Sequence, residues 1–306
     1  MGQTKTLTLL VTLIAVLAVV AAGMGVFYQG EGASYEFTSI RGEAVKIQGH
    51  GLYRYDPASV AAQGIAQDVV TLVVGIPLLA VSLVLYRRGQ LRGHLLLAGT
   101  LGYFLYTYAS IAFGAAFNPL FLVYVALFSL SLFALTTAMV SVDLRALPSH
   151  FSDRLPRRAI AIFMFAGAAF LILAWLGRIV PAQIADTPPY GLESNTTLFI
   201  QVLDLGLVVP VMILAGVTLL RRRPLGYLLV SVGLVKFSTM GLALIAMIIG
   251  MLLAGVPVAA AEGIVFPTLA LAALVLTFLL LRNLRESRPV VAPLKARRAG
   301  RRRARR

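Results

Sequence analysis

The sequence predicts an all-α fold, a polytopic membrane helix bundle with eight transmembrane helices, on three observations. Hydrophobic residues make up 59% of the 306 residues and charged residues only 13%, whereas about a quarter of a soluble domain is charged. Several apolar runs reach the roughly 20 residues that a helix needs to cross a bilayer. Clusters of Lys and Arg fall in alternate connections between these runs.

The N-terminal element, residues 1–27, contains the first apolar run at 7–27, which follows a single positive charge, Lys5. Small residues at 21–23 would suit cleavage of a signal peptide. The run is longer than the roughly 7–15 apolar residues of a signal peptide, which favours a retained anchor helix. Both interpretations put the next segment outside the cytoplasm.

Residues 28–66 form an extracytoplasmic segment that we expect to cap the outer face of the bundle. Residues 35–40 and 44–48 alternate in polarity as strands do, with a glycine turn between them. A two-stranded hairpin is marginal alone in water, so it should rest on the helices. Asp56 and Pro57 resemble the N-cap and the first residue of the next helix.

The other transmembrane helices fall in two groups, residues 67–143 and 159–281, on either side of a cytoplasmic loop at 144–158. Breaks between the apolar runs carry Pro, Gly or clusters of Arg, which are typical of connections. The seven runs cover residues 66–86, 95–115, 120–142, 159–179, 197–220, 225–253 and 258–281.

Lys and Arg concentrate on one side of the predicted bundle, which the positive-inside rule assigns to the cytoplasm. The connections after the second, fourth and sixth runs are rich in Arg, whereas the connection between the fifth and sixth runs has no Lys or Arg but contains Asp186 and Glu193. This alternation predicts that the N-terminus and C-terminus are both cytoplasmic. The Ala-, Leu- and Arg-rich composition without cysteine favours the plasma (inner) membrane of a prokaryote.

The tail, residues 282–306, carries eleven Lys or Arg against one Glu. Such a basic tail beside a membrane is expected to contact anionic lipid headgroups. We therefore expect the lipid bilayer and its headgroups as partners, and no specific nucleic acid.

An offset of 133 residues relates the second to fourth runs to the sixth to eighth. Residues of the same type then coincide: Arg88, Gly93, Leu101 and Phe104 fall on Arg221, Gly226, Leu234 and Phe237. The match favours two four-helix halves in the same orientation, a parallel 4+4 internal repeat. Parallel repeats occur in transporters, although not in transporters alone.

Ionisable side chains inside the apolar runs are the candidate functional residues, because a charge at a helix centre costs about 2.5–3.5 kcal/mol on insertion scales. Lys236 follows Arg223 by 13 residues and Asp204 precedes Arg221 by 17. At about 1.5 Å per residue they lie roughly 20 and 25 Å above those arginines. We expect an Asp204–Lys236 ion pair, which either only orders the bundle or serves a ligand.

The other intramembrane charges also fall in the outer half of the bilayer, which predicts a polar pocket that opens outward under the 28–66 cap. Tyr103 and Tyr106 share a face of the third run and would line it. Helix contact by hydroxyl and small residues, and snorkelling of Arg178 to the headgroups, are the structural alternatives. The ligand- or ion-binding candidates are Asp68, Tyr103, Tyr106, Arg178, Asp204, Lys236 and Glu262.

No cofactor or metal is expected. The chain has no cysteine, its three histidines are far apart, and it contains no Walker A, dinucleotide-binding, HExxH or nucleophile-elbow motif. A retinal-type Schiff base on Lys236 with Asp204 as counter-ion is disfavoured, because a single tryptophan, Trp175, leaves few large rings for such a pocket.

Three function classes remain. The favoured one is a transporter or permease-like protein that binds a small polar solute or an ion at the outward-facing site. The second is a non-enzymatic sensory or assembly subunit of a membrane complex. The third is a membrane enzyme that acts on a lipid-linked substrate at the outer leaflet, and it is the least favoured because the loops lack dense catalytic residues.

Overall fold

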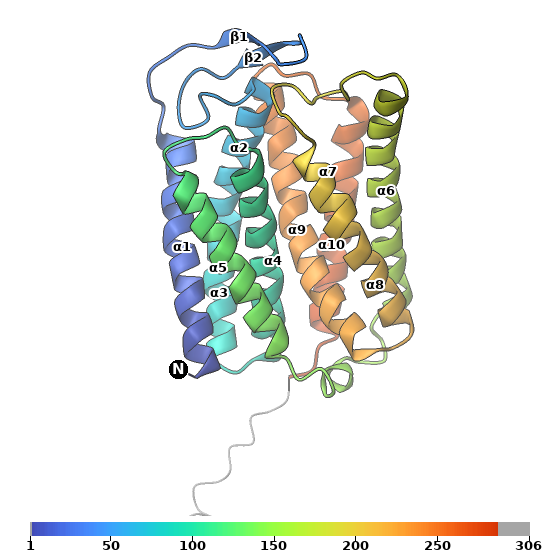
Figure 1. Cartoon of the computed structure of the whole chain (residues 1–306). Coiled ribbons are helices and arrows are strands. Elements are labelled where there is room, and N and C mark those ends of the chain that lie inside the picture. Colours follow the sequence, from blue (N-terminus) through green and yellow to red (C-terminus); the bar gives the residue numbers. More distant parts are fainter. Residues whose placement is uncertain (1, 287–306) are drawn as a thin grey trace, which may run out of the picture.

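The computed structural model describes residues 2–286, and within them eight helical spans are long and apolar enough to cross a membrane (Figure 1). The predicted bundle of eight transmembrane helices is confirmed, and the chain is a multi-pass membrane protein. A helix satisfies its own backbone hydrogen bonds, which hydrocarbon requires of any chain that crosses it. The helices are α1 (Gln3–Phe27), α2 (Ala58–Val70), α3 (Ile76–Arg87), α4 (Leu91–Gly114), α5 (Phe121–Val140), α6 (Arg157–Ile184), α7 (Phe199–Leu203), α8 (Val209–Leu220), α9 (Pro224–Leu253) and α10 (Ala260–Arg282).

Two of the eight spans are interrupted by a π-helical turn. Thr71–Gly75 separates α2 from α3, and Asp204–Val208 separates α7 from α8. Pro77 and Pro210 follow these turns at the start of the next helical segment. A proline lacks an N–H and clashes with the carbonyl four residues earlier, and in both spans that carbonyl lies within the wide turn.

The outer cap contains the expected hairpin, with strands β1 (Tyr35–Thr38) and β2 (Ala44–Ile47) paired antiparallel. Gly42 in the connection has a φ of 85°, which a residue with a side chain rarely adopts. Ile47 is 2% exposed and anchors one strand. The hairpin lies over the outer end of the bundle in Figure 1, so the cap rests on helices as expected.

The start of the second span differs from the sequence prediction. Helix α2 begins at Ala58, eight residues before the predicted start at 66, and its N-cap is Pro57 without a side-chain cap. The expectation that Asp56 caps this helix is wrong. Its carboxylate accepts a hydrogen bond of 2.7 Å from the backbone N–H of Ala116, and this bond ties the cap to the end of α4.

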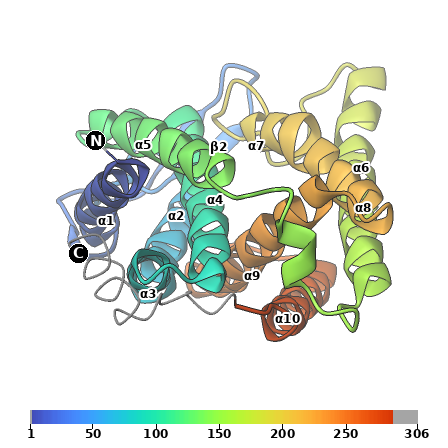
Figure 2. The ribbon, with the colours of Figure 1, turned by 90° about the horizontal axis from the view of Figure 1, so that it is seen from below.

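Helices α1 to α5 lie on one side of the bundle and α6 to α10 on the other, with α4 and α9 in contact between them (Figure 2). A β-carbon at Gly99 of α4 would overlap the side chain of Val235 on α9. The absence of a side chain at Gly99 therefore lets these two central helices approach closely, which is a common device of helix contacts in lipid.

The inner turns that join α3 to α4 and α8 to α9 have the same geometry. Gly89 has a φ of 75° and Arg222, at the offset of 133 residues, a φ of 53°. Gly93 and Gly226 each pack against the backbone of the helix before the turn. The two π-helical turns are separated by the same offset.

The basic tail predicted over residues 282–306 lies outside the described residues beyond 286. Its first residues are fixed at the end of the bundle opposite the cap (Figure 1). Glu286 accepts hydrogen bonds from the backbone N–H groups of Leu91 (2.8 Å) and Arg92 (2.9 Å). A carboxylate at the start of α4 is favourable, because the N-terminus of a helix presents free N–H groups and a partial positive charge.

Candidate binding site at the centre of the bundle

The central polar site is built around Lys236, on the face of α9 that meets α4. Its Nζ lies 4.0 Å from the ring centroid of Tyr106 and 4.7 Å from that of Phe237. Both distances are within the range of cation–π attraction, which strengthens when the cation is removed from water. The lysine stem passes over Gly102 of α4, where the absence of a side chain leaves room for it.

Asp204 lies at the first residue of the second π-helical turn and is 6% exposed. Its Oδ1 accepts a hydrogen bond of 2.7 Å from the Tyr106 hydroxyl, and its Oδ2 accepts one of 2.9 Å from the Trp175 indole N–H. Both donors come from other helices, α4 and α6. A carboxylate buried in this way is satisfied on both oxygens by neutral donors.

The predicted direct ion pair between Asp204 and Lys236 is wrong. The ammonium packs on the ring face of Tyr106 and the carboxylate binds the hydroxyl of the same residue. One tyrosine therefore contacts both charges, the cation with its ring face and the carboxylate with its hydroxyl. The sequence places Asp204 and Lys236 on consecutive helices, but it contains no signal that a side chain of a third helix contacts both of them.

The Lys236 ammonium has no hydrogen bond or ion pair within residues 2–286, although it can donate three hydrogen bonds. The side chain is partly exposed. Lys236 is also the only basic residue of α5, α7, α8 and α9.

Asp68 belongs to a separate cluster under the cap, at the end of α2. Its Oδ2 accepts a hydrogen bond of 2.6 Å from the hydroxyl of Tyr53, a residue of the cap. Burial beside this carboxyl raises the pKa of Tyr53 well above its ordinary value, so the phenol keeps its proton and remains the donor. Asp68 is 2% exposed and Tyr53 3% exposed, so this carboxyl is enclosed by protein under the cap.

Tyr103 joins the same cluster and not the Lys236 site. Its hydroxyl bonds to the side chains of Gln67 and Thr71. At the offset of 133 residues, Tyr103 corresponds to Lys236 and Thr71 to Asp204, so an uncharged pair occupies the position that the charged residues occupy in the other half. The nearby Tyr108 hydroxyl is fully buried and has no hydrogen-bond partner within the described chain.

Arg178 and Glu262 lie away from both clusters. Arg178, near the end of α6, faces the loop at Gly191 and the carboxylate of Glu193. Glu262 is exposed in the first turn of α10. The structure therefore brings together Tyr106, Asp204 and Lys236 in one site and Asp68 with Tyr103 in another, and it does not gather all seven candidates in one pocket.

Two carboxyl groups outside the helices, Asp56 in the cap and Glu193 in the loop before α7, have raised pKa values because protein surrounds them. Burial raises the pKa of Asp56 from 3.8 to about 7, against the opposing effect of its hydrogen bond from Ala116. Burial also raises the pKa of Glu193, while hydrogen bonds from Ser59 and the charge of Arg178 lower it. Glu193 accepts from the Ser59 hydroxyl at 2.6–2.7 Å, which fastens the outer loop to the start of α2.

Trp175 and Tyr53 are the partners that sequence reasoning missed. Trp175 is the only tryptophan of the chain, and a single indole within a span is a recognisable donor for a buried carboxylate. Tyr53 lies in the aromatic run of residues 51–56, which is distinctive but carries no spacing that predicts a contact with Asp68.

Within residues 2–286 no group of three or more His, Asp or Glu side chains is arranged to hold a metal ion. Comparison of the chain with protein families, with curated proteins and with solved structures finds no match.

Proposed function

We propose that the protein is a transporter or permease-like protein, and that it binds a small polar solute or an ion carrying negative charge at Lys236. The observation that carries this proposal is the difference between the two charged partners. Asp204 has a donor on each oxygen, whereas the ammonium of Lys236 has only ring faces beside it. An anionic group could take up the free N–H groups without displacing an existing hydrogen bond.

The position of the site supports the same proposal. Lys236 comes from α9 and Tyr106 from α4, so the site spans the junction of the two sets of helices. Asp204 begins a π-helical turn, and such turns occur frequently at functional sites. Interrupted helices near the middle of the membrane, at the interface of two repeats, are the usual substrate sites of secondary transporters.

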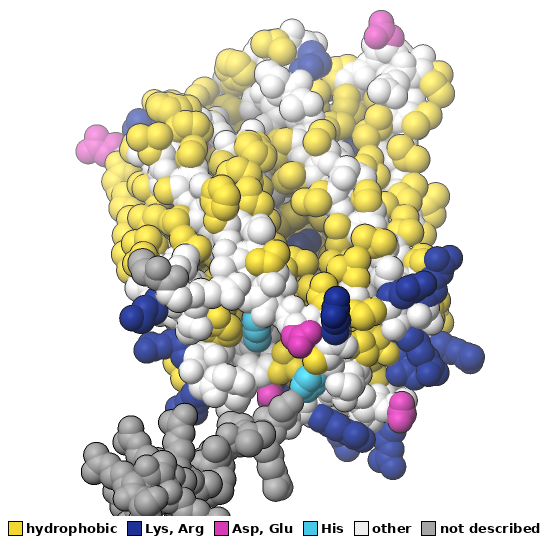
Figure 3. Space-filling model, turned by 60° about the horizontal axis from the view of Figure 1, so that its bottom comes forward, with side chains coloured by type: hydrophobic (Ala, Val, Ile, Leu, Met, Phe, Trp, Pro, Cys, Tyr) yellow, Lys and Arg dark blue, Asp and Glu magenta, His cyan; other side chains and the backbone are white. Residues whose placement is uncertain are grey.

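We infer that the two sets of helices are a parallel 4+4 repeat. The matching π-helical turns and the matching inner turns, all separated by 133 residues, support it. We also propose that the arginine-rich end faces the cytoplasm of a prokaryotic cell, with the cap outside. Anionic lipid headgroups would then contact the inner end, where Figure 3 shows the basic side chains.

Uptake into proteoliposomes tests the proposal. The purified protein would be tested with isotopically labelled phosphate, small mono- and dicarboxylates and amino acids. We expect uptake of at least one of these solutes, reduced about tenfold or more by Lys236→Met, because removal of one partner of a charge-assisted contact costs at least that much.

The matched control is Lys5→Met, which removes a lysine that is exposed at the start of α1. It should leave uptake unchanged, and both variants must elute as folded protein. Absence of uptake and of measurable binding for every solute tested, or equal uptake by Lys236→Met, would contradict the proposal.

A further inference from the structure

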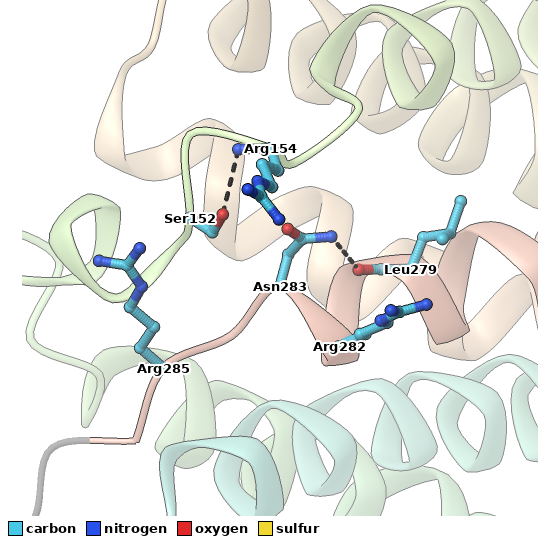
Figure 4. Close-up of a pocket in the computed structure, with 6 residues that line it drawn as sticks. All are labelled: Ser152, Arg154, Leu279, Arg282, Asn283 and Arg285. Atoms are coloured by element: carbon cyan, nitrogen blue, oxygen red, sulfur yellow. Dashed lines mark hydrogen bonds between the residues drawn. The ribbon is translucent and has the colours of Figure 1, made fainter.

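A second polar feature lies at the inner end of the bundle, far along the helices from Lys236. It is a hollow of about 370 Å³ between the loop before α6 and the end of α10 (Figure 4). Polar and basic side chains dominate its wall. The lining residues are Ser152, Arg154, Leu279, Arg282, Asn283 and Arg285.

The wall of this hollow is held by backbone pairing. Phe151 and Leu284 form an isolated antiparallel bridge. On one side of it the N–H of Ser152 donates to the carbonyl of Asn283 at 2.9 Å, and on the other the N–H of Arg285 donates to the carbonyl of His150 at 2.7 Å. These bonds fix the backbone of the loop relative to the end of α10, so the side chains of both segments start from defined positions.

The charge of the hollow is uncompensated within the described chain. Three arginines line it and no Asp or Glu does. Glu286 lies next in sequence, but its carboxylate binds the backbone N–H groups at the start of α4. Asp153 is exposed and does not line the hollow. Like charges gathered at one hollow repel one another unless an anion lies among them.

The geometry points to a group with several negatively charged oxygens. Arg154 and Arg282 lie on either side of Asn283 in Figure 4, and Arg285 lies on the other side of Ser152. The Ser152 hydroxyl accepts a hydrogen bond from the backbone N–H of Arg154 and keeps its own hydrogen to donate. Guanidinium forks match phosphate oxygens in pairs, and a hydroxyl can complete the coordination.

We propose that this hollow is a binding site for a phosphate group. The same chemistry is offered by the phosphodiester of an anionic lipid headgroup and by a soluble phosphate compound. The inner end of a span is the level of the headgroups, so both sources can reach it. The site is independent of the solute site proposed at Lys236.

The test uses the cysteine-free chain with one introduced cysteine, Ser149→Cys, which carries a fluorescent label beside the hollow. Ser149 is exposed and does not line it. The full chain is placed in nanodiscs of phosphatidylcholine and titrated with inorganic phosphate. A second arm compares these nanodiscs with nanodiscs that also contain phosphatidylglycerol.

The test variant replaces Arg154, Arg282 and Arg285 by Gln. The matched control replaces Arg87, Arg88 and Arg221 by Gln, three exposed arginines that remove the same charge but do not line the hollow. Both variants keep every basic residue of 287–306, so binding to that part of the tail cancels between them. Thermal unfolding of each variant checks that the bundle remains folded.

A saturable response to inorganic phosphate that weakens about tenfold in the test variant and less than about twofold in the control supports a soluble phosphate ligand. A response only to phosphatidylglycerol, with the same difference between variants, supports a lipid headgroup. Absence of a response in both arms overturns the proposal, as does an equal loss in the control variant.

Discussion

The hydroxyl of Tyr106 donates a hydrogen bond of 2.7 Å to the carboxylate of Asp204, a residue 98 positions away in the sequence. The ring of the same tyrosine carries the ammonium of Lys236 on its face. One side chain from α4 therefore holds both charges of the central site, one through its oxygen and the other through its π electrons. This arrangement leads to separate predictions for the hydroxyl and for the ring.

Replacing Tyr106 by Phe removes the hydroxyl and keeps the ring. We expect the free energy of unfolding in detergent to fall by about 1.5–3 kcal/mol, the usual contribution of a hydrogen bond to a charged group. Replacing it by Leu should cost more, because the cation–π contact is lost as well. Tyr28→Phe, which changes a half-exposed tyrosine outside the site, is the control. Equal stability of Tyr106→Phe and wild type would show that the bond contributes nothing.

Tyr53 and Asp68 should be energetically coupled across the junction of cap and bundle. Tyr53→Phe leaves the buried carboxyl of Asp68 without its donor at 2.6 Å, and we expect a loss of about 1–3 kcal/mol. A double-mutant cycle with Asp68→Asn isolates the pair, and its coupling energy should reach about 0.5–3 kcal/mol. Tyr55→Phe, on an exposed neighbour, should be silent. A coupling energy of zero would show that the hydrogen bond between Tyr53 and Asp68 contributes nothing to stability.

Because the Asp56 carboxyl is buried, we expect the cap to be more stable in mild acid than in mild base. Burial raises its folded-state pKa from 3.8 to about 7, so the folded protein favours the protonated carboxyl. The contribution of this carboxyl to the free energy of unfolding is fully present below about pH 4. It is lost as the pH rises through about 7, and the total loss is about 4 kcal/mol.

Asp56→Asn should abolish this dependence, since the amide oxygen still accepts from Ala116 and carries no charge at any pH. Unfolding midpoints measured from pH 4 to pH 8 on both proteins give the comparison. A wild-type profile that stays parallel to that of the variant across this range would contradict the assignment.

Gly25 should not tolerate a side chain. A β-carbon there would overlap the carboxylate of Asp68, so Gly25→Ala must displace either α1 or the Asp68–Tyr53 pair. We expect a loss of about 1–3 kcal/mol, typical of an overfilled interior. Gly23→Ala is the matched control on the same helix, because nothing lies within 4 Å of its β-carbon. Equal thermal stability of the two variants would show that α1 can move to make room for the side chain with no loss of stability.

The spans and the hairpin could be predicted because their signals are local. A run of apolar residues of sufficient length is a span whatever its neighbours are, and alternation over residues 35–38 and 44–47 indicates strands by itself. The early start of α2 does not follow from the sequence pattern, because residues 58–65 contain small and polar side chains that interrupt the apolar run but continue the helix.

The contacts of the site could be predicted only in part because they join distant helices. The depths of Asp204 and Lys236 follow from their distances to the inner arginines, and both lie in one cluster as expected. That Tyr106 and Trp175 complete the cluster depends on how α4 and α6 are rotated. Apolar spans carry no alternation of charge that would fix this rotation, so Tyr103, three residues from Tyr106, was placed in the same site although it serves the other one.

The π-helical turns have a consequence for reading any helical wheel of this chain. Each wide turn holds one residue more than an ordinary turn, and one residue corresponds to about 100° around the axis. In each of these two spans, the side chains before the wide turn are therefore rotated about the helix axis relative to the side chains after it. A stripe of residues drawn at constant period along 58–87 or 199–220 therefore turns by about a quarter of the helix circumference between its two ends, and scanning mutagenesis should find that its sensitive positions change phase at these two points.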